Sequence, residues 1–185
     1  MKDTEIWNEL CGGQKSALKR IYDRYAHDLL LYGCKLCRDR TMVEDALQEI
    51  FIHCWEKRAT LPEVNNIRSY LFTAIRRKLY RELAYSPPWR SLDGEASLKR
   101  EMSIPFDPMI TVNESAFGGT AEQKKLMVEV RKMIAQLSER QREIVYLKYI
   151  EGMDYEEITQ IMGLSYQSSR NLLSKALKNL RNLNI

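Results

Sequence analysis

Apolar residues recur every three or four positions along the first 84 residues, as at Ile21, Tyr25 and Leu29 and again from Val43 to Trp55. This spacing places them on one face of an amphipathic helix. Because the pattern repeats with polar breaks between its stretches, residues 1–84 are predicted to form a bundle of four or five helices.

Helix ends within this bundle are predicted from capping and turn residues. Gly12-Gly13 would stop a short first helix. Thr41 would cap the helix that opens at Met42. The segment from Pro62 to Asn66 would form a loop before a further helix.

Residues 85–121 lack an apolar period and contain four of the five prolines: Pro87, Pro88, Pro105 and Pro108. This stretch is longer than ordinary loops within a domain and is predicted to be a linker. Helical spacing resumes after it, with Ser138 as an N-cap and Gly152 at a helix end. The chain is therefore predicted to be all-α, with two small helical domains, 1–84 and 122–185, joined by an irregular linker, 85–121.

The segment from Tyr155 to Arg181 has the pattern of a helix-turn-helix. Ile158, Ile161 and Met162 share the inner face of a short helix, Gly163 permits a tight turn, and Ser165 caps the next helix. The predicted buried stripe of that second helix is Leu172, Leu173, Ala176, Leu177 and Leu180. Its other side chains can hydrogen-bond base edges and phosphates. A helical hairpin with a solvated face is the plainer alternative.

Charge divides unevenly along the chain. The net charge of +4 is the sum of two basic ends and an acidic middle. Residues 64–81 and 158–185 contain basic side chains and no Asp or Glu. A helix that is merely solvated normally mixes both signs, so these two acid-free stretches favour two contacts with a polyanion.

The second half of the chain resembles region 4 of the bacterial sigma factors. The segment from Leu137 to Val145 is similar to the opening of that region, and the helix-turn-helix is similar to its second half, which reads the −35 promoter element. The usual S-x-x-T-V-R stands here as Ser165 to Arg170, with Ser169 where an inward-facing valine is usual. The resemblance implies −35 contacts from Tyr166, Gln167, Ser168, Arg170, Asn171, Ser174 and Lys175.

The segment from Val43 to Glu56 resembles the "AEDxxQExFxxxW" core of sigma region 2. At helical spacing, one face carries Asp45, Gln48, Glu49 and Ile52, while Leu47, Ile50, Phe51 and Trp55 can point into the bundle. In the family, the polar face binds the clamp helices of the largest subunit of core RNA polymerase. Judged by amphipathicity alone, a core helix with solvated acids fits the same pattern.

The segment from Asn66 to Lys78 resembles the stretch of sigma region 2 that holds the −10 element as it melts. Cations that follow a strand, beside aromatic rings that stack on bases, suit this task. The resemblance implies −10 contacts from Asn65, Asn66, Arg68, Tyr70, Arg76, Arg77 and Lys78, together with the loop from about Thr60. Phe72 is expected in the core.

Four cysteines raise the question of a metal or redox site. Cys34 and Cys37 with His53 and Cys54 do not form a recognised zinc spacing, so no metal is expected. No phosphate loop, dinucleotide motif or nucleophile elbow occurs, so neither a cofactor nor an enzymatic activity is expected. A thiol-based sensor built on Cys34, Cys37 and Cys54 remains an alternative.

Together, the resemblances indicate an extracytoplasmic-function (ECF) sigma factor that acts by binding. The implied partners are core RNA polymerase, promoter DNA and an anti-sigma factor. A dimeric helix-turn-helix regulator is the main alternative; it would explain residues 122–185 and leave the Asp45 to Phe51 face unused. With no apolar leader and no run of eighteen apolar residues, a cytoplasmic chain without membrane insertion is expected.

Overall fold

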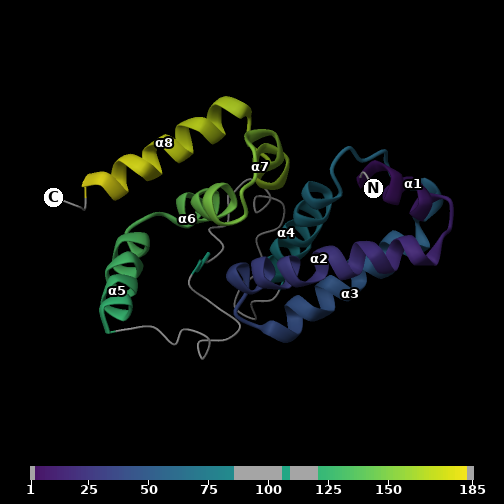
Figure 1. The fold of residues 1–185 in the computed structure, drawn as a ribbon, viewed down its shortest axis with the longest axis horizontal. Helices are drawn as coiled ribbons and strands as arrows, with labels where there is room; N and C mark the ends of the chain where they lie inside the picture. The colour runs from purple at the N-terminus through teal and green to yellow at the C-terminus, as the bar shows by residue number, and fades with distance from the viewer. Residues whose placement is uncertain (1–2, 86–105, 109–120, 183–185) are drawn as a thin grey trace, which may run out of the picture. The chain divides into compact units, whose positions relative to one another are not determined.

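A computed structural model describes residues 3–85, 106–108 and 121–182. Across these ranges every regular element is a helix and no strand occurs (Figure 1). The all-α prediction is confirmed. The chain divides into two compact units, Met1–Pro105 and Phe106–Ile185. Most of the predicted linker, residues 86–105 and 109–120, lies outside the described residues, so the linker stays a prediction.

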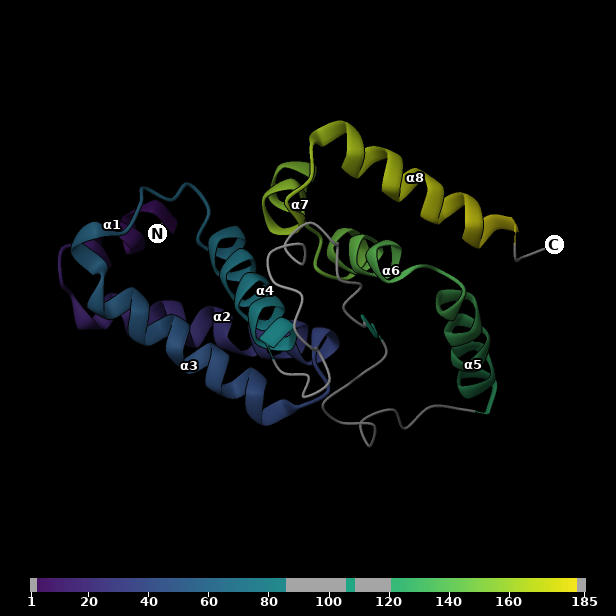
Figure 2. The ribbon, with the colours of Figure 1, turned by 180° about the vertical axis from the view of Figure 1, so that it is seen from behind.

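The first unit is a bundle of α1 (Asp3–Cys11), α2 (Lys15–Leu36), α3 (Arg40–Glu56) and α4 (Ile67–Tyr85), with a short 3-10 turn, η1 (Arg58–Thr60). Helices α2, α3 and α4 pack against one another, and α1 contacts α2, α4 and η1 (Figure 2). Their buried faces supply the core, which includes Leu29, Val43, Phe51, Leu71 and Ile75.

Gly33 on α2 allows three helices of this bundle to approach closely. A Cβ atom at this position would lie 2.5 Å from Cγ1 of Val43 on α3 and 3.2 Å from Cδ1 of Ile75 on α4. Real Cβ atoms do not come so close to a neighbour, so a larger residue would force the helices apart. Glycine is therefore a packing requirement here.

The start of α3 differs from the prediction. We expected Thr41 to cap the helix, but the N-cap is Asp39, whose Oδ1 accepts hydrogen bonds from the backbone amides of Thr41 and Met42 at 3.0 and 3.2 Å. A carboxylate at the N-cap also interacts favourably with the positive end of the helix dipole. The helix thus begins two residues earlier than expected.

Trp55, near the end of α3, was expected to point into the bundle and is only half-buried. Its ring lies under two cations, with the Arg58 guanidinium 4.4 Å and the Lys15 amine 5.9 Å from the ring centre. Cation–π contacts of this kind keep a large aromatic side chain favourable at the surface. The other three residues of the predicted inner face, Leu47, Ile50 and Phe51, are buried as expected.

The second unit contains α5 (Ala121–Ala135), α6 (Glu139–Val145), a π-helical turn η4 (Tyr146–Ile150), α7 (Tyr155–Met162) and α8 (Tyr166–Asn182). Helix α8 packs against α6 and α7. Ser138 begins α6 with a capping box that it shares with Gln141, which confirms the predicted N-cap. Gly152, after η4, has a positive φ of 67°.

Phe106 belongs to the core of this second unit, although it falls within the predicted linker. Its side chain is buried, and its ring centre lies 5.6 Å from that of Tyr146. Arg142 donates a hydrogen bond from Nη1 to the Phe106 carbonyl oxygen at 3.3 Å. Phe106 therefore contributes to the packing of this unit.

The buried stripe of α8 is narrower than predicted. Leu173 and Ala176 are buried, Leu172 and Leu180 are half-buried, and Leu177 is 36% exposed. Leu177 lines an open groove between α8 and η4, so no neighbouring helix covers it. Ser169 is fully buried in the same stripe, and its hydroxyl has no hydrogen-bond partner among the described residues.

Candidate functional sites

The outer face of α3 carries the four residues predicted to bind polymerase. Asp45, Gln48 and Glu49 are exposed, and Ile52 beside them is 54% exposed. Residues on the opposite face, such as Ala46 and Ile50, are buried against the bundle. The helix therefore holds an apolar side chain and three polar side chains in a fixed row facing solvent.

The loop before α4 leads directly into the helix through Asn66. The Asn66 Oδ1 atom accepts a hydrogen bond from the Ser69 amide at 3.0 Å, so this side chain caps the helix. Asn65 is exposed one residue earlier. Of the two predicted −10 asparagines, Asn65 is thus accessible in the loop, whereas Asn66 has a structural contact at the helix start.

Two side chains of α4 are tied to aromatic rings. The Arg68 guanidinium lies 5.4 Å from the ring centre of Phe72, which is buried as expected. Arg76 lies 4.3 Å from the ring centre of Tyr80 and donates a hydrogen bond to its hydroxyl at 2.8 Å. Tyr80 thus orients one of the predicted strand-binding cations.

Lys78 is held by two carboxylates. Its amine lies 2.5 Å from Glu49 Oε2 on α3 and 2.8 Å from Glu82 Oε1 on α4, and its side chain is 17% exposed. Burial lowers the pKa of Lys78, but the hydrogen bonds and charges of the two carboxylates outweigh this effect and raise the pKa above its ordinary value. Lys78 therefore stays protonated, and the two carboxylates engage two of the three N–H donors of its ammonium group. Its neighbour Arg77 is exposed.

The helix-turn-helix is built as predicted. Helix α7 begins with a capping box between Asp154 and Glu157 and ends at Gly163, which adopts a left-handed conformation with φ 63° and ψ 37°. The Ser165 hydroxyl accepts a hydrogen bond from the Ser168 amide at 3.1 Å and so caps α8. The rings of Tyr155 and Tyr166 lie 5.5 Å apart and link the starts of the two helices.

Helix α8 divides the predicted −35 residues into two rows. Gln167, Asn171 and Lys175 follow one another every four residues, and all three are exposed. Gln167 donates a hydrogen bond to Asn171 Oδ1 at 3.0 Å. Of the remaining predicted residues, Ser168 flanks this row at the first turn and is also exposed. We refer to Gln167, Ser168, Asn171 and Lys175 as the polar row.

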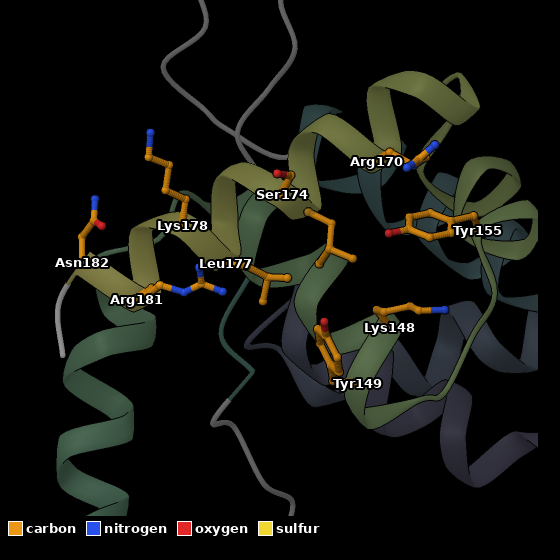
Figure 3. A pocket seen from close by; sticks show the side chains of 10 residues that line it. Lys148, Tyr149, Tyr155, Arg170, Ser174, Leu177, Lys178, Arg181 and Asn182 are labelled. Atoms are coloured by element: carbon orange, nitrogen blue, oxygen red, sulfur yellow. The ribbon is translucent and has the colours of Figure 1, made fainter.

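Arg170 and Ser174 belong to the second row and line the groove between α8, α7 and η4. This groove encloses about 600 Å³ and has four cations along it, Lys148, Arg170, Lys178 and Arg181, with no Asp or Glu among its described lining residues. Figure 3 shows Lys148, Tyr155 and Arg170 at one end and Lys178 and Asn182 at the other. Tyr166 is 52% exposed, with the Arg170 guanidinium 6.0 Å from its ring centre.

The four cysteines are free thiols, and three of them, Cys34, Cys37 and Cys54, are buried. Burial raises the pKa of Cys54 to about 12. Within the described ranges, no three His, Cys, Asp or Glu side chains converge to hold a metal ion. Nor does any helix in the described part of the chain have the length and apolar character needed to span a membrane.

A capped helix-turn-helix with a polar, acid-free second helix defines the second unit as a DNA-binding module. Family comparison agrees for both units. Residues 127–180 match "Sigma-70, region 4" and residues 21–86 match "Sigma-70 region 2".

Proteins with similar sequences are also named RNA polymerase sigma factors. A probable RNA polymerase sigma factor RfaY of Xanthomonas campestris is 28% identical over 183 residues, which cover 97% of this chain and 44% of that relative's length. The ECF sigma factor SigM of Bacillus subtilis is 22% identical over 90% of this chain and 94% of its own. The chain belongs to the sigma-70 family and is an RNA polymerase sigma factor of the ECF type.

Two solved structures share the fold. CnrH, solved with the cytosolic domain of CnrY, superposes with a TM-score of 0.62 at 16% identity, covering 98% of this chain and 96% of its own. The sigma factor RpoE of Bartonella quintana, solved with the anti-sigma factor NepR, superposes with a TM-score of 0.60 at 20% identity. The match covers 89% of this chain and 94% of RpoE.

Proposed function

We propose that this sigma factor joins core RNA polymerase through the outer face of α3 and brings it to promoters, acting by binding and not by catalysis. The observation that carries this proposal is the exposure of Ile52 beside Asp45 and Gln48. An apolar anchor with hydrogen-bonding neighbours is typical of a protein docking site. A regulator that binds DNA alone has no need of such a face in a separate unit.

The two units would divide promoter recognition between them. In the second unit, the polar row of α8 would enter the major groove of the −35 element, and Arg170 would lie at the edge of the groove, where phosphates lie. In the first unit, the loop before α4 and the cations of α4 would hold the −10 element as its strands separate. Core polymerase and promoter DNA lie in the bacterial cytoplasm, so we expect the chain to act there.

An inhibitor protein is a further expected partner. The sigma factor RpoE was solved in complex with the anti-sigma factor NepR, and CnrH with the cytosolic domain of CnrY. Because this chain shares their fold over most of its length, we expect it to bind an anti-sigma factor of its own.

Titration of core polymerase with the labelled chain tests the docking face. Replacing Asp45 and Gln48 together by alanine should weaken binding by about 2–4 kcal/mol if the two side chains are central to the interface. Helix content should not change, because both side chains are exposed. The matched control replaces Lys19 and Asp23 by alanine, an exposed ion pair on α2, and should bind as the wild type does.

Equal affinity of the Asp45/Gln48 variant and the wild type would overturn the assignment of α3. Binding of palindromic duplex DNA by a homodimer, without capture of core polymerase, would instead establish the chain as an ordinary helix-turn-helix regulator.

A further inference from the structure

Helix α1 is fastened to the loop that precedes α4. The Trp7 indole N–H donates a hydrogen bond to the carbonyl oxygen of Pro62 at 2.9 Å. Within the described part of the chain, this is the one hydrogen bond that another element makes to residues 61–65. Pro62, Glu63 and Asn65 are otherwise exposed. Leu61 and Val64 are half-buried, so Trp7 supplies the hydrogen bond that holds this loop in addition to their apolar contacts.

Trp7 also touches a second residue predicted to contact the −10 element. Its ring meets that of Tyr70 edge to face, with centres 5.0 Å apart. Trp7 itself is 1% exposed, while Tyr70 is half-buried. The buried Trp7 side chain thus makes two contacts. Its N–H group binds the loop, and its ring packs against the Tyr70 ring on α4.

The helix that carries Trp7 is anchored independently of the loop. Asp3 accepts hydrogen bonds from Arg24 at 2.8 Å and from the Tyr25 hydroxyl at 2.7 Å, both on α2. Glu9 pairs with Arg20, also on α2. Burial and the bond to Asp3 raise the pKa of Tyr25 to about 12, so this donor keeps its proton at neutral pH. Trp7 therefore reaches the loop from a fixed support.

We propose that Trp7 is a positioning residue for promoter recognition, holding the loop of residues 61–66 and the Tyr70 ring in the arrangement that receives a separated strand of the −10 element. The family match for region 2 covers residues 21–86, so α1 lies outside it. This proposal rests on the proposed function of the loop. It assigns a part in that function to Trp7, which lies outside the matched segment.

Trp7→Phe is the informative substitution, because it keeps an aromatic ring against Tyr70 and removes the N–H donor. Holoenzyme assembled from the full chain would be bound to promoter templates that are unpaired across the −10 element, with each non-template base varied in turn. The preference for one base over another is first mapped with the wild-type chain. In Trp7→Phe, the strongest preference should fall by about three- to ten-fold, as the loss of one net hydrogen bond allows.

Ile6→Val is the matched control, because it trims a buried side chain of α1 that has no hydrogen bond to the loop. Both variants should bind core polymerase with wild-type affinity. Hydrogen exchange of the free chains gives a second measurement that does not require DNA. The Ser69 and Tyr70 amides, which donate hydrogen bonds to Asn66 at the end of the loop, give this loop exchange. They should exchange about three- to ten-fold faster in Trp7→Phe than in Ile6→Val, since the loop has lost its anchor.

The outcomes separate the possibilities. Base preference and loop exchange that both match Ile6→Val would overturn the proposal, and so would faster loop exchange with unchanged base preference. If the wild-type holoenzyme shows no base preference across the −10 element, the proposed function of the loop fails, and with it the role of Trp7 in recognition. Loop exchange would then still report whether Trp7 anchors the loop.

Discussion

Replacing Ser169 by alanine should stabilise the second unit, because the Ser169 hydroxyl is buried and has no hydrogen-bond partner among the described residues. Its side chain is 0% exposed in the stripe of α8 that faces α6 and α7. Burying a hydroxyl without a hydrogen bond costs about 1–3 kcal/mol. Alanine also favours the helix over serine by about 0.5 kcal/mol.

The small void left by the missing oxygen offsets part of this gain. We therefore expect the free energy of unfolding to rise by about 1–2 kcal/mol in Ser169→Ala. For a unit of about 80 residues, this corresponds to a rise in Tm of about 4–16 °C. The Ser69 hydroxyl on α4 is likewise buried and has no partner in the described part of the chain, so Ser69→Ala should stabilise the first unit by a similar amount.

Hydrogen exchange of α8 peptides in the full chain measures the effect, since no tryptophan follows residue 89 to report on the second unit by fluorescence. Ser174→Ala is the matched control, because this serine is exposed on the same helix and should give only the propensity gain of about 0.5 kcal/mol. If Ser169→Ala protects α8 no better than Ser174→Ala does, the hydroxyl has a partner and the reasoning is wrong.

Three further changes test other parts of the structure. Glu49→Gln removes one of the two carboxylates that hold Lys78, and because Glu49 is largely exposed, urea unfolding should change by less than about 1 kcal/mol. The Cys54 pKa, raised from 9.0 to about 12, favours the protonated thiol in the folded state, so its contribution is complete below pH 9 and is lost as pH rises toward 12. Urea midpoints measured from pH 8 to 11 should therefore fall less steeply in Cys54→Ala. Gly163→Ala should destabilise the second unit by about 1–2 kcal/mol through its left-handed backbone alone, since no atom crowds the site, and thermal unfolding should show a smaller loss for Gly163→Asn.

Local features of the chain were predictable because their causes are local. The Gly163 turn and the Ser165 cap depend on residues within four positions of each other, and both appear as expected. The early start of α3 also has a local cause, because aspartate at position 39 is a preferred N-cap and lies two residues before Thr41.

Contacts between distant segments were not predictable from spacing. The apolar period of α8 continues to Leu177, but periodicity does not show where the covering helices end, and Leu177 lines an open groove. The charge of Lys78 suggested a free cation, whereas its pairing with Glu49 depends on how α3 and α4 pack. The bond from Trp7 to Pro62 has no sequence signature, because it joins residues 55 positions apart.

That separation of 55 positions also sets an order of events during synthesis. At about 5–20 residues per second, the ribosome makes Pro62 about 3–11 s after Trp7. Through this interval α1, a helix of 9 residues, is too short to hold its shape alone, and its apolar side chains Ile6 and Leu10 have no completed core to enter. Helix α1 can pair with α2 before the loop exists, but its contacts with η1, Pro62 and α4 form only after those residues are made. The loop therefore takes its final position against a helix that was synthesised seconds before it.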